Sequence, residues 1–245
     1  MSPETPGECG ELTETARLEE GTSIPSSWPL LEEFFDCPAA RPEWMDVLWS
    51  LGWRHFARHF FRYSVSTQEG RLVQVIPLRM DLDAWIPSKS QARILRLNSD
   101  LEVTIQKPQL DEEHRRLFQG HTGRFRSNVP QSLEDFMGPH PGETAAGYPC
   151  ECWEICVRRF GVLVAASYLD LGIQAASSVY GFFSLDEHRR SLGIATLLWE
   201  IDYARQRGCR FLYPGYAFVQ PSPYDYKKRL GFLQAYDWQD WKAFP

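Results

Sequence analysis

Two arginines stand before a short glycine-containing turn in the stretch HRRSLGIATLL, residues 188–198. From Arg190 onward the sequence fits the pattern R-x-x-G-x-A, which leaves the first turn of a helix without bulky side chains. The free backbone N–H groups and the positive end of the helix dipole at such a turn attract anions, phosphate above all. The predicted phosphate site comprises Arg189, Arg190, Ser191, Gly193 and Ala195. An exposed helix start flanked by arginines fits the same six residues equally well.

Basic residues gather around this stretch in a chain that is acidic as a whole. Residues 188–229 contain eight Arg or Lys and three acids, whereas the whole chain has a formal net charge of -6. Such an asymmetry is typical of a surface that binds nucleic acid, because lysine and arginine neutralise backbone phosphates. A solvated helix face is the alternative interpretation.

Length and composition limit the class of protein. At 245 residues, with 43% hydrophobic and 14% aromatic residues, the chain can bury a sizeable globular core. No apolar run approaches the roughly 18–20 residues that span a bilayer, and the N-terminus lacks the apolar segment of a secretory signal. We therefore expect a cytoplasmic protein without a membrane partner, and its oligomeric state is left open.

The cysteines favour neither a disulfide framework nor a metal site. Six cysteines in a chain of this length are not typical of a disulfide-stabilised fold. Cys150, Cys152 and Cys156 lie in one expected strand, and their spacing, without a second pair or a nearby histidine, does not match a zinc motif. The sequence therefore predicts no metal and no other cofactor.

The hydrophobic pattern predicts the elements that would position the motif. Apolar residues recur at helical spacing from Ser191 to Arg207, and Gly208 is suited to end this helix. Three strands are expected before it, within 151–185, and one after it that is interrupted by Pro214-Gly215. Further helices are expected within 41–53, 88–100 and 110–125, and further strands within 54–65, 70–82 and 100–108. This order predicts an α/β (α+β) fold with a mixed sheet flanked by helices.

Composition divides the chain into three parts. Residues 1–25 hold six Glu against one Arg, with several Ser, Thr, Pro and Gly, so we expect a disordered acidic tail there. Residues 26–110 are expected to form a smaller N-terminal α/β region. Residues 111–245 are expected to form the C-terminal domain that carries the motif.

The motif, the strand order around it and the ending YDYKKRLGF resemble the GNAT acyltransferase superfamily. A more specific resemblance covers residues 35–240, which are similar to the arginyl-tRNA–protein transferase family, including the bacterial aspartate/glutamate leucyltransferases. It rests on five segments in the family's order: LWSLGWRH, IPLRMDLDAWIPSKSQARILRLNSDLEV, ASYLDLG, SSVYGFFSLDEHRRSLGIATLLWEIDYARQRG and FLYPGYAFVQPSPYDYKKRLGF. The resemblance implies a GNAT-like fold that takes aminoacyl-tRNA in place of acyl-CoA.

The resemblance also implies the reaction and the residues that serve it. An aminoacyl group, arginine or leucine, would pass from tRNA to the N-terminal α-amino group of an acceptor protein with an acidic N-terminus, marking it for degradation. Direct transfer is expected, because no Ser/His/Asp or Cys/His nucleophile set stands out. The residues predicted to act on the ester and the amine are Tyr216, Tyr226, Asp170 and Asp225. Lys227 is predicted to bind tRNA phosphate, and the predicted substrate-binding residues are Arg79, Lys89, Arg93 and Tyr180. Core aromatics and ordinary surface charges are the alternatives.

The chain departs from the family pattern in two ways. The family's early cysteines, able to hold a metal or an iron–sulfur cluster, are missing apart from Cys37, so no cluster is predicted. Pro214 and Asp225 stand where the family usually has Leu and Met, which suggests altered aminoacyl or acceptor specificity. An acyl-CoA-dependent GNAT N-acyltransferase, and a catalytically degenerate module that binds RNA or a partner, stay open as alternatives.

Overall fold

A computed structural model describes residues 24–125, 129–139, 141 and 148–244. The tail expected at residues 1–25 therefore falls almost entirely outside the described residues. No described helix is long and apolar enough to cross a membrane.

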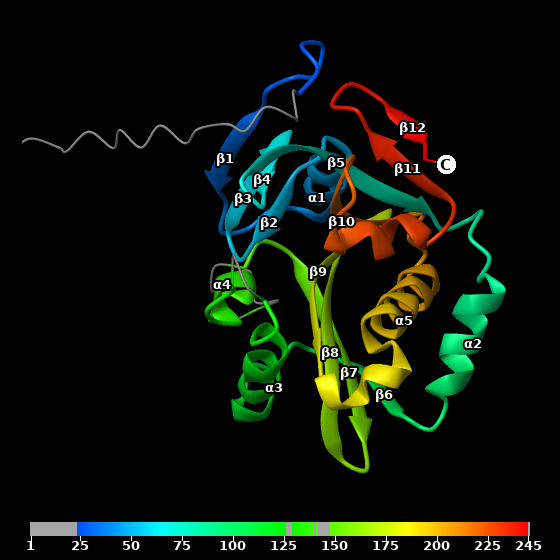
Figure 1. Ribbon diagram of the computed structural model, residues 1–245. Coiled ribbons are helices and arrows are strands. Elements are labelled where there is room, and N and C mark those ends of the chain that lie inside the picture. The colour runs from blue at the N-terminus through cyan, green and yellow to red at the C-terminus, as the bar shows by residue number, and fades with distance from the viewer. Residues whose placement is uncertain (1–23, 126–128, 140, 142–147, 245) are drawn as a thin grey trace, which may run out of the picture.

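A mixed sheet of nine strands forms the centre of the fold (Figure 1). Eight strands follow the order β12-β11-β5-β10-β9-β8-β7-β6, and β4 also pairs with β5. The strands are β4 (Val65–Gln68), β5 (Arg71–Asp81), β6 (Glu102–Gln106), β7 (Glu151–Arg159), β8 (Val162–Leu171), β9 (Ala175–Phe183), β10 (Phe211–Phe218), β11 (Leu233–Tyr236) and β12 (Trp241–Ala243). Because β5 and β6 lie in it with β7 to β12, strands from both sides of residue 110 share one sheet.

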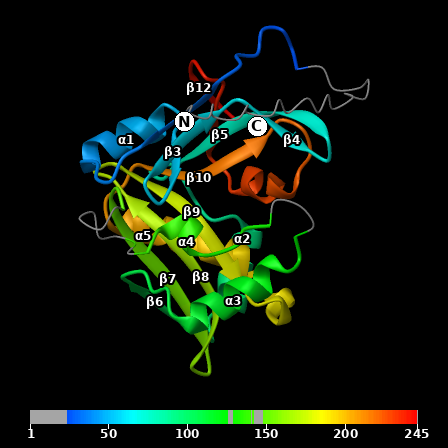
Figure 2. The same ribbon diagram turned by 90° about the vertical axis from the view of Figure 1, so that its left-hand side faces the viewer.

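Helices cover both faces of the long strands β7, β8 and β9 (Figures 1 and 2). α5 (Leu192–Gln206) packs on one face with α2 (Lys89–Leu97) against it, while α3 (Glu112–Thr122) and α4 (Glu134–Met137) lie on the other. α1 (Pro42–Ser50) and a small sheet of β1 (Glu32–Asp36), β3 (His59–Tyr63) and β2 (Arg54–Phe56) complete the fold. The expected mixed sheet flanked by helices is confirmed. The single strand expected within 54–65 is instead two strands, because Ala57 adopts a left-handed conformation (φ 46°) that turns the chain.

The helix predicted from Ser191 to Arg207 is confirmed as α5, shorter by one residue at each end. On its expected apolar face Leu197, Leu198 and Ile201 are buried against the sheet. This burial, together with the spacing of about 3.6 residues per turn, explains why the segment is helical and where it packs.

Strands β9 and β10 lie side by side over only three residue pairs. Their parallel pairing joins Phe211–Tyr213 to Ala175–Ser177, after which β10 continues along β5. Its register on β5 shifts between Leu212 and Gly215, where Pro214 has no N–H to donate. The 3-10 helix η3 (Pro223–Arg229), orange in Figure 1, then packs against β10. Strands β9 and β10 therefore separate after Tyr213, and η3 packs against β10.

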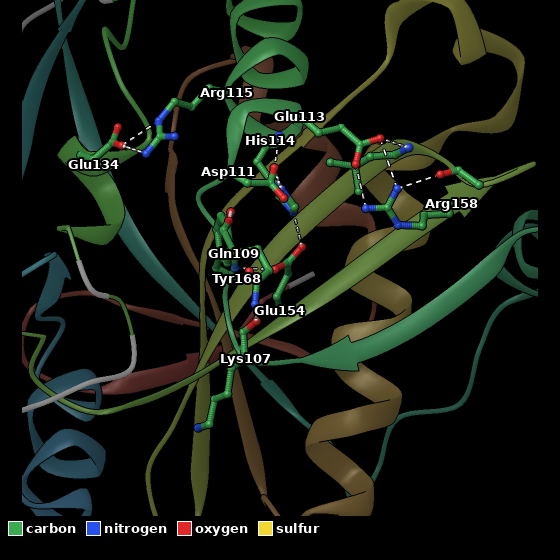
Figure 3. A network of polar contacts seen from close by, with 12 residues as sticks. Lys107, Gln109, Asp111, Glu113, His114, Arg115, Glu134, Glu154, Arg158 and Tyr168 are labelled. Carbon is green, nitrogen blue, oxygen red and sulfur yellow. Dashed lines mark hydrogen bonds and ion pairs between the residues drawn. The ribbon is translucent and has the colours of Figure 1, made fainter.

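A buried histidine ties α3 to the sheet (Figure 3). The His114 ring lies with Nδ1 2.7 Å from Asp111 Oδ1 and Nε2 2.8 Å from Glu154 Oε1, so both nitrogens donate to carboxylates. Burial opposes the positive charge, but the hydrogen bonds that the ring donates to Cys156, Glu154 and Asp111, with the charge of Glu154, outweigh it and raise the pKa of His114 to about 10. The ring is therefore an imidazolium at neutral pH.

Replacing His114 by glutamine is expected to lower the free energy of unfolding at pH 7 by about 3 kcal/mol, because Glu154 stays buried without its cation. The raised pKa makes this stabilisation complete below the unfolded-state value near 6.5, and it disappears as pH rises through about 10. Urea unfolding at pH 7 and pH 10.5 measures the difference in the free energy of unfolding between wild type and variant, which should disappear at the higher pH. Arg116→Gln, which breaks an exposed pair on the same helix, should change stability at neither pH.

Candidate active site at the divergence of two strands

Three ionisable side chains from three different elements meet where β9 and β10 separate. Glu200 lies on α5, Lys227 on η3 and Arg54 on β2. The charges of Arg54 and Glu200 both act on Lys227, in opposite directions. Among the described residues no carboxylate lies within ion-pair distance of Arg54 or Lys227. Such a set of strongly perturbed groups is typical of a functional site.

Glu200 is a carboxylate held entirely out of water. Its side chain is 0% exposed, and neither carboxylate oxygen has a hydrogen-bond partner among the described residues. Burial raises the pKa of Glu200 to about 7, an effect that nearby Ser167, Ser178 and Lys227 only partly offset. Because a buried unpaired carboxylate destabilises a fold, its presence on the main helix calls for a role beyond packing.

Lys227 reaches into the separation between the strands. Its Nζ lies 3.4 Å from the carbonyl oxygen of Tyr216, and a Cβ built on Gly215 would come within 3.0 Å of that nitrogen. Gly215, at φ 97°, therefore provides both the turn and the space that Lys227 occupies. Burial and the charge of Arg54 lower the pKa of Lys227 to about 8, against the smaller opposing effect of Glu200. A lysine with a pKa lowered to about 8 is partly neutral near pH 7.5, so it can accept a proton and later donate it.

Arg54 is a buried guanidinium that has no negative partner within the described part of the chain. It is 6% exposed and donates to the carbonyl oxygens of Trp53 (2.6 Å) and Leu78 (3.4 Å), and its Nε has no hydrogen-bond partner among the same residues. The guanidinium lies 5.0 Å from the ring centroid of Tyr213 and 5.5 Å from that of Tyr216. Cation–π contacts hold it in place while part of its donor capacity stays free.

The predicted tyrosines lie near this cluster but do different things. Tyr216 donates its hydroxyl to the carbonyl oxygen of Gly52 at 2.7 Å, so it anchors the N-terminal region to β10. Tyr226 is 39% exposed beside Lys227, and the charge of Glu200 acts on it. The hydroxyl of Tyr180 has no partner among the described residues, and burial raises its pKa to about 12. Tyr226 is therefore partly open to a ligand, the Tyr180 hydroxyl is buried with no partner among the described residues, and the Tyr216 hydroxyl is occupied.

The start of α5 differs from the open anion site that the motif predicts. Arg190 is fully engaged, with bonds of 2.7 and 2.9 Å to Asp100 and one of 2.9 Å to Glu187. A Cβ on Gly193 would meet the Phe183 ring at 2.8 Å, and Ala195 is buried, so both small residues serve packing. The adjoining hollow of about 440 Å³ is lined by three acids and three arginines, together with Leu97 and His188. Arg189 and Ser191 stay near the surface, but the turn carries no clear excess of positive charge.

The other predicted residues contact partners outside the set of Glu200, Lys227 and Arg54. Asp170 is fully buried against His55 and Tyr148. Asp225 forms an ion pair of 2.8 Å with Lys228, which lowers its pKa. Arg79 is stacked between Phe211 and Trp241.

Lys89 and Arg93 lie exposed on α2. The SKSQ element, which includes Lys89, caps this helix, since the Ser88 hydroxyl accepts from the Gln91 N–H. The Gln91 amide also donates to the carbonyl oxygen of Leu230 at 3.0 Å.

Sequence reasoning missed Glu200 and Arg54. A signal for Glu200 was available, because this acid falls on the apolar face of α5, three residues after Leu197 and four before Ala204. No comparable signal marks Arg54, whose burial depends on Tyr213 and Tyr216, more than 150 residues later in the chain.

Comparisons with known proteins bear on the family and the fold of the chain. The family model described as "Arginine-tRNA-protein transferase, C terminus" matches residues 109–237. An aspartate/glutamate leucyltransferase from Xanthomonas campestris is 30% identical over 69% of each chain, and one from Pseudomonas putida is 29% identical over 94% of this chain and 98% of its own. The crystal structure of FemX superposes with a TM-score of 0.51 at 10% identity, covering 78% of this chain and 65% of that one, which is similarity of fold alone.

Proposed function

We propose that this chain, which belongs to the arginine-tRNA-protein transferase family, moves an aminoacyl group, arginine or leucine, from tRNA to the N-terminal α-amino group of an acceptor protein. The observation that carries the proposal is the lysine at the strand divergence, flanked by a buried acid and a buried guanidinium. Aminolysis of an ester needs a group that removes a proton from the amine, and Lys227 is tuned for that.

In the proposed mechanism the neutral amine of Lys227 takes one proton from the acceptor's α-ammonium group. The freed amine attacks the carbonyl carbon of the aminoacyl ester, a C–N bond forms and the C–O bond to the terminal ribose breaks. The ammonium of Lys227 then returns its proton to the departing ribose oxygen, and the attacking nitrogen releases its second proton to solvent, which leaves the amide N–H. Tyr180 and Tyr226 are the hydroxyls proposed to orient the ester. Aminoacyl-tRNA is the only co-substrate, and no covalent enzyme intermediate forms.

The acceptor is proposed to begin with Asp or Glu. The related leucyltransferases are named for these two residues, and Arg54 supplies a guanidinium able to pair with a carboxylate. Addition of a residue to such an N-terminus would mark the acceptor for degradation. The compartment that follows from a charged tRNA as co-substrate is the cytoplasm.

Incubating the protein with total charged tRNA and synthetic peptides tests the proposal directly. Mass spectrometry should show the mass of one aminoacyl residue added to peptides beginning with Asp or Glu, and much less to matched Asn or Gln peptides. Uncharged tRNA and acyl-CoA serve as controls. Addition of an acyl group from acyl-CoA would support an N-acyltransferase instead, and binding of tRNA without any transfer would support a non-catalytic module.

A further inference from the structure

A second group of buried polar side chains lies next to the candidate site, since His55 follows Arg54 on β2 and the charge of Asp170 acts on Glu200. His55 from β2, Cys150 just before β7 and Asp170 from β8 are all buried. One nitrogen, one sulfur and one carboxylate oxygen of these three lie within 4.8 Å of one another. None of the three takes part in the mechanism proposed above.

The outward-facing atoms of this group are fixed by hydrogen bonds. His55 Nδ1 lies 2.8 Å from the carbonyl oxygen of Ala57 and donates a hydrogen bond to it, which fixes the orientation of the ring. Asp170 Oδ1 accepts from the Tyr148 hydroxyl at 3.0 Å. Metal-ligating histidines and carboxylates are oriented in this way, through the atom that does not bind the ion.

The inward-facing atoms of the same two residues are left without hydrogen bonds. His55 Nε2 and Asp170 Oδ2 are 2.8 Å apart, yet they are not aligned for a hydrogen bond and neither has a partner among the described residues. Buried polar atoms without hydrogen bonds destabilise a fold unless a ligand satisfies them, and a bound cation would satisfy both. The Cys150 thiol lies beside this gap, and Cys152, paired in register with Asp170, has its thiol next to the same carboxylate.

The network of His114 in Figure 3 contains similar residue types but differs in its hydrogen bonds. It too brings a histidine, an acid and a cysteine together, in His114, Glu154 and Cys156. There both ring nitrogens are hydrogen-bonded to carboxylates, so a proton on each satisfies the group. The contrast identifies the His55 group as the one whose facing ring nitrogen and carboxylate oxygen have no hydrogen-bond partner among the described residues.

We propose that His55, Cys150 and Asp170 bind a zinc ion. Imidazole, carboxylate and thiolate are zinc's usual protein ligands, and one such atom from each of the three residues lies within 4.8 Å of the other two. On binding, the Cys150 thiol releases its proton to solvent and its sulfur becomes a thiolate. Because every ligand is buried, the ion would be structural and would join β2 to the central sheet.

This inference replaces the expectation that the chain binds no metal. That expectation rested on the spacing of the cysteines along one strand. The structure adds a histidine and an aspartate from positions 55 and 170, which no local spacing could reveal. None of these three residues has a step in the proposed reaction, so the zinc site does not depend on that proposal.

Elemental analysis of the full-length protein, purified without chelators, tests the site. About one zinc ion per chain is expected. Replacing zinc by Co²⁺ should give the thiolate-to-cobalt charge-transfer band in the near ultraviolet. Cys150→Ala should lose the band and most of the zinc. Tyr148→Phe, which keeps all ligands but frees Asp170, should weaken zinc binding about 10- to 100-fold.

Cys156→Ala is the matched control, because this cysteine is equally buried on the same sheet but belongs to the proton-filled network. It should keep the zinc and the cobalt band. The proposal would be overturned by wild-type protein that contains no zinc and shows no thiolate band with Co²⁺. Metal retained in full by the Cys150 variant would overturn it equally, since the ion would then lie elsewhere.

Discussion

Replacing Lys227 by methionine is expected to lower kcat/KM for aminoacyl transfer by about 100- to 10,000-fold. Methionine keeps the length of the side chain next to Gly215 but cannot accept a proton. The wild-type rate should rise with pH up to about 8, because the neutral form of Lys227 increases as pH passes its lowered pKa. The variant should lose this limb of the pH profile. Steady-state transfer of labelled aminoacyl groups at several pH values measures both effects.

Lys228→Met is the control for this experiment. Lys228 neighbours Lys227 in the sequence, but its charge is paired with Asp225 at 2.8 Å, and it has no place in the proposed proton transfer. Its removal should change kcat/KM by less than about tenfold while keeping the pH dependence. Near-normal activity of the Lys227 variant with an unchanged profile would exclude this lysine as the proton carrier.

Local patterns predict the elements of this fold well. The helix at residues 192–206, the capping box at Ser88 and the hairpins between β7, β8 and β9 each depend on residues close together in the sequence. Periodicity and turn chemistry act over such short ranges, so they can be recognised without the structure. The order of these elements, together with the family resemblance, was enough for the mixed sheet.

Side-chain partners were not predictable in the same way. Arg190 looks free in the sequence but is bound to Asp100, 90 residues earlier. The basic residues of 188–229 also fail to form one surface. Arg189 precedes α5, whereas Arg205, Arg207 and Arg210 cluster at its other end, about 22 Å away for a helix of this length. A count of charges along a segment does not reveal that separation.

The two departures from the family pattern gain a structural context. Pro214 lies where β10 leaves β9, and a residue without an N–H fits a strand that loses its partner there. Asp225 neutralises Lys228 on η3, which leaves Lys227 as the unpaired lysine of that helix facing Glu200 and Arg54. Both substitutions thus border the candidate site, and changed specificity stays a prediction.

Replacing Glu200 by glutamine is expected to make the protein more stable above pH 7 and less active. The pKa of Glu200 is raised to about 7 in the folded protein, against about 4.5 when unfolded. As pH rises from 4.5 through 7, the unfolded chain ionises first, so the wild type loses up to about 3 kcal/mol of stability. Glutamine has no such loss. Urea unfolding at pH 5 and pH 8 should therefore show an advantage for the variant that grows with pH.

The activity of the Glu200 variant tests its role as a positioning residue that acts through Lys227. Without the negative charge the ammonium form of Lys227 is less favoured, so the rising limb of the pH–rate profile should move to lower pH. A packing role alone would leave that limb in place. Asp202→Asn, on the exposed side of the same helix, should alter neither stability nor profile. A variant that is stabilised, slower and shifted in pH would show that the buried carboxylate is kept for the reaction at the expense of the fold, whereas an unshifted profile would remove Glu200 from the mechanism.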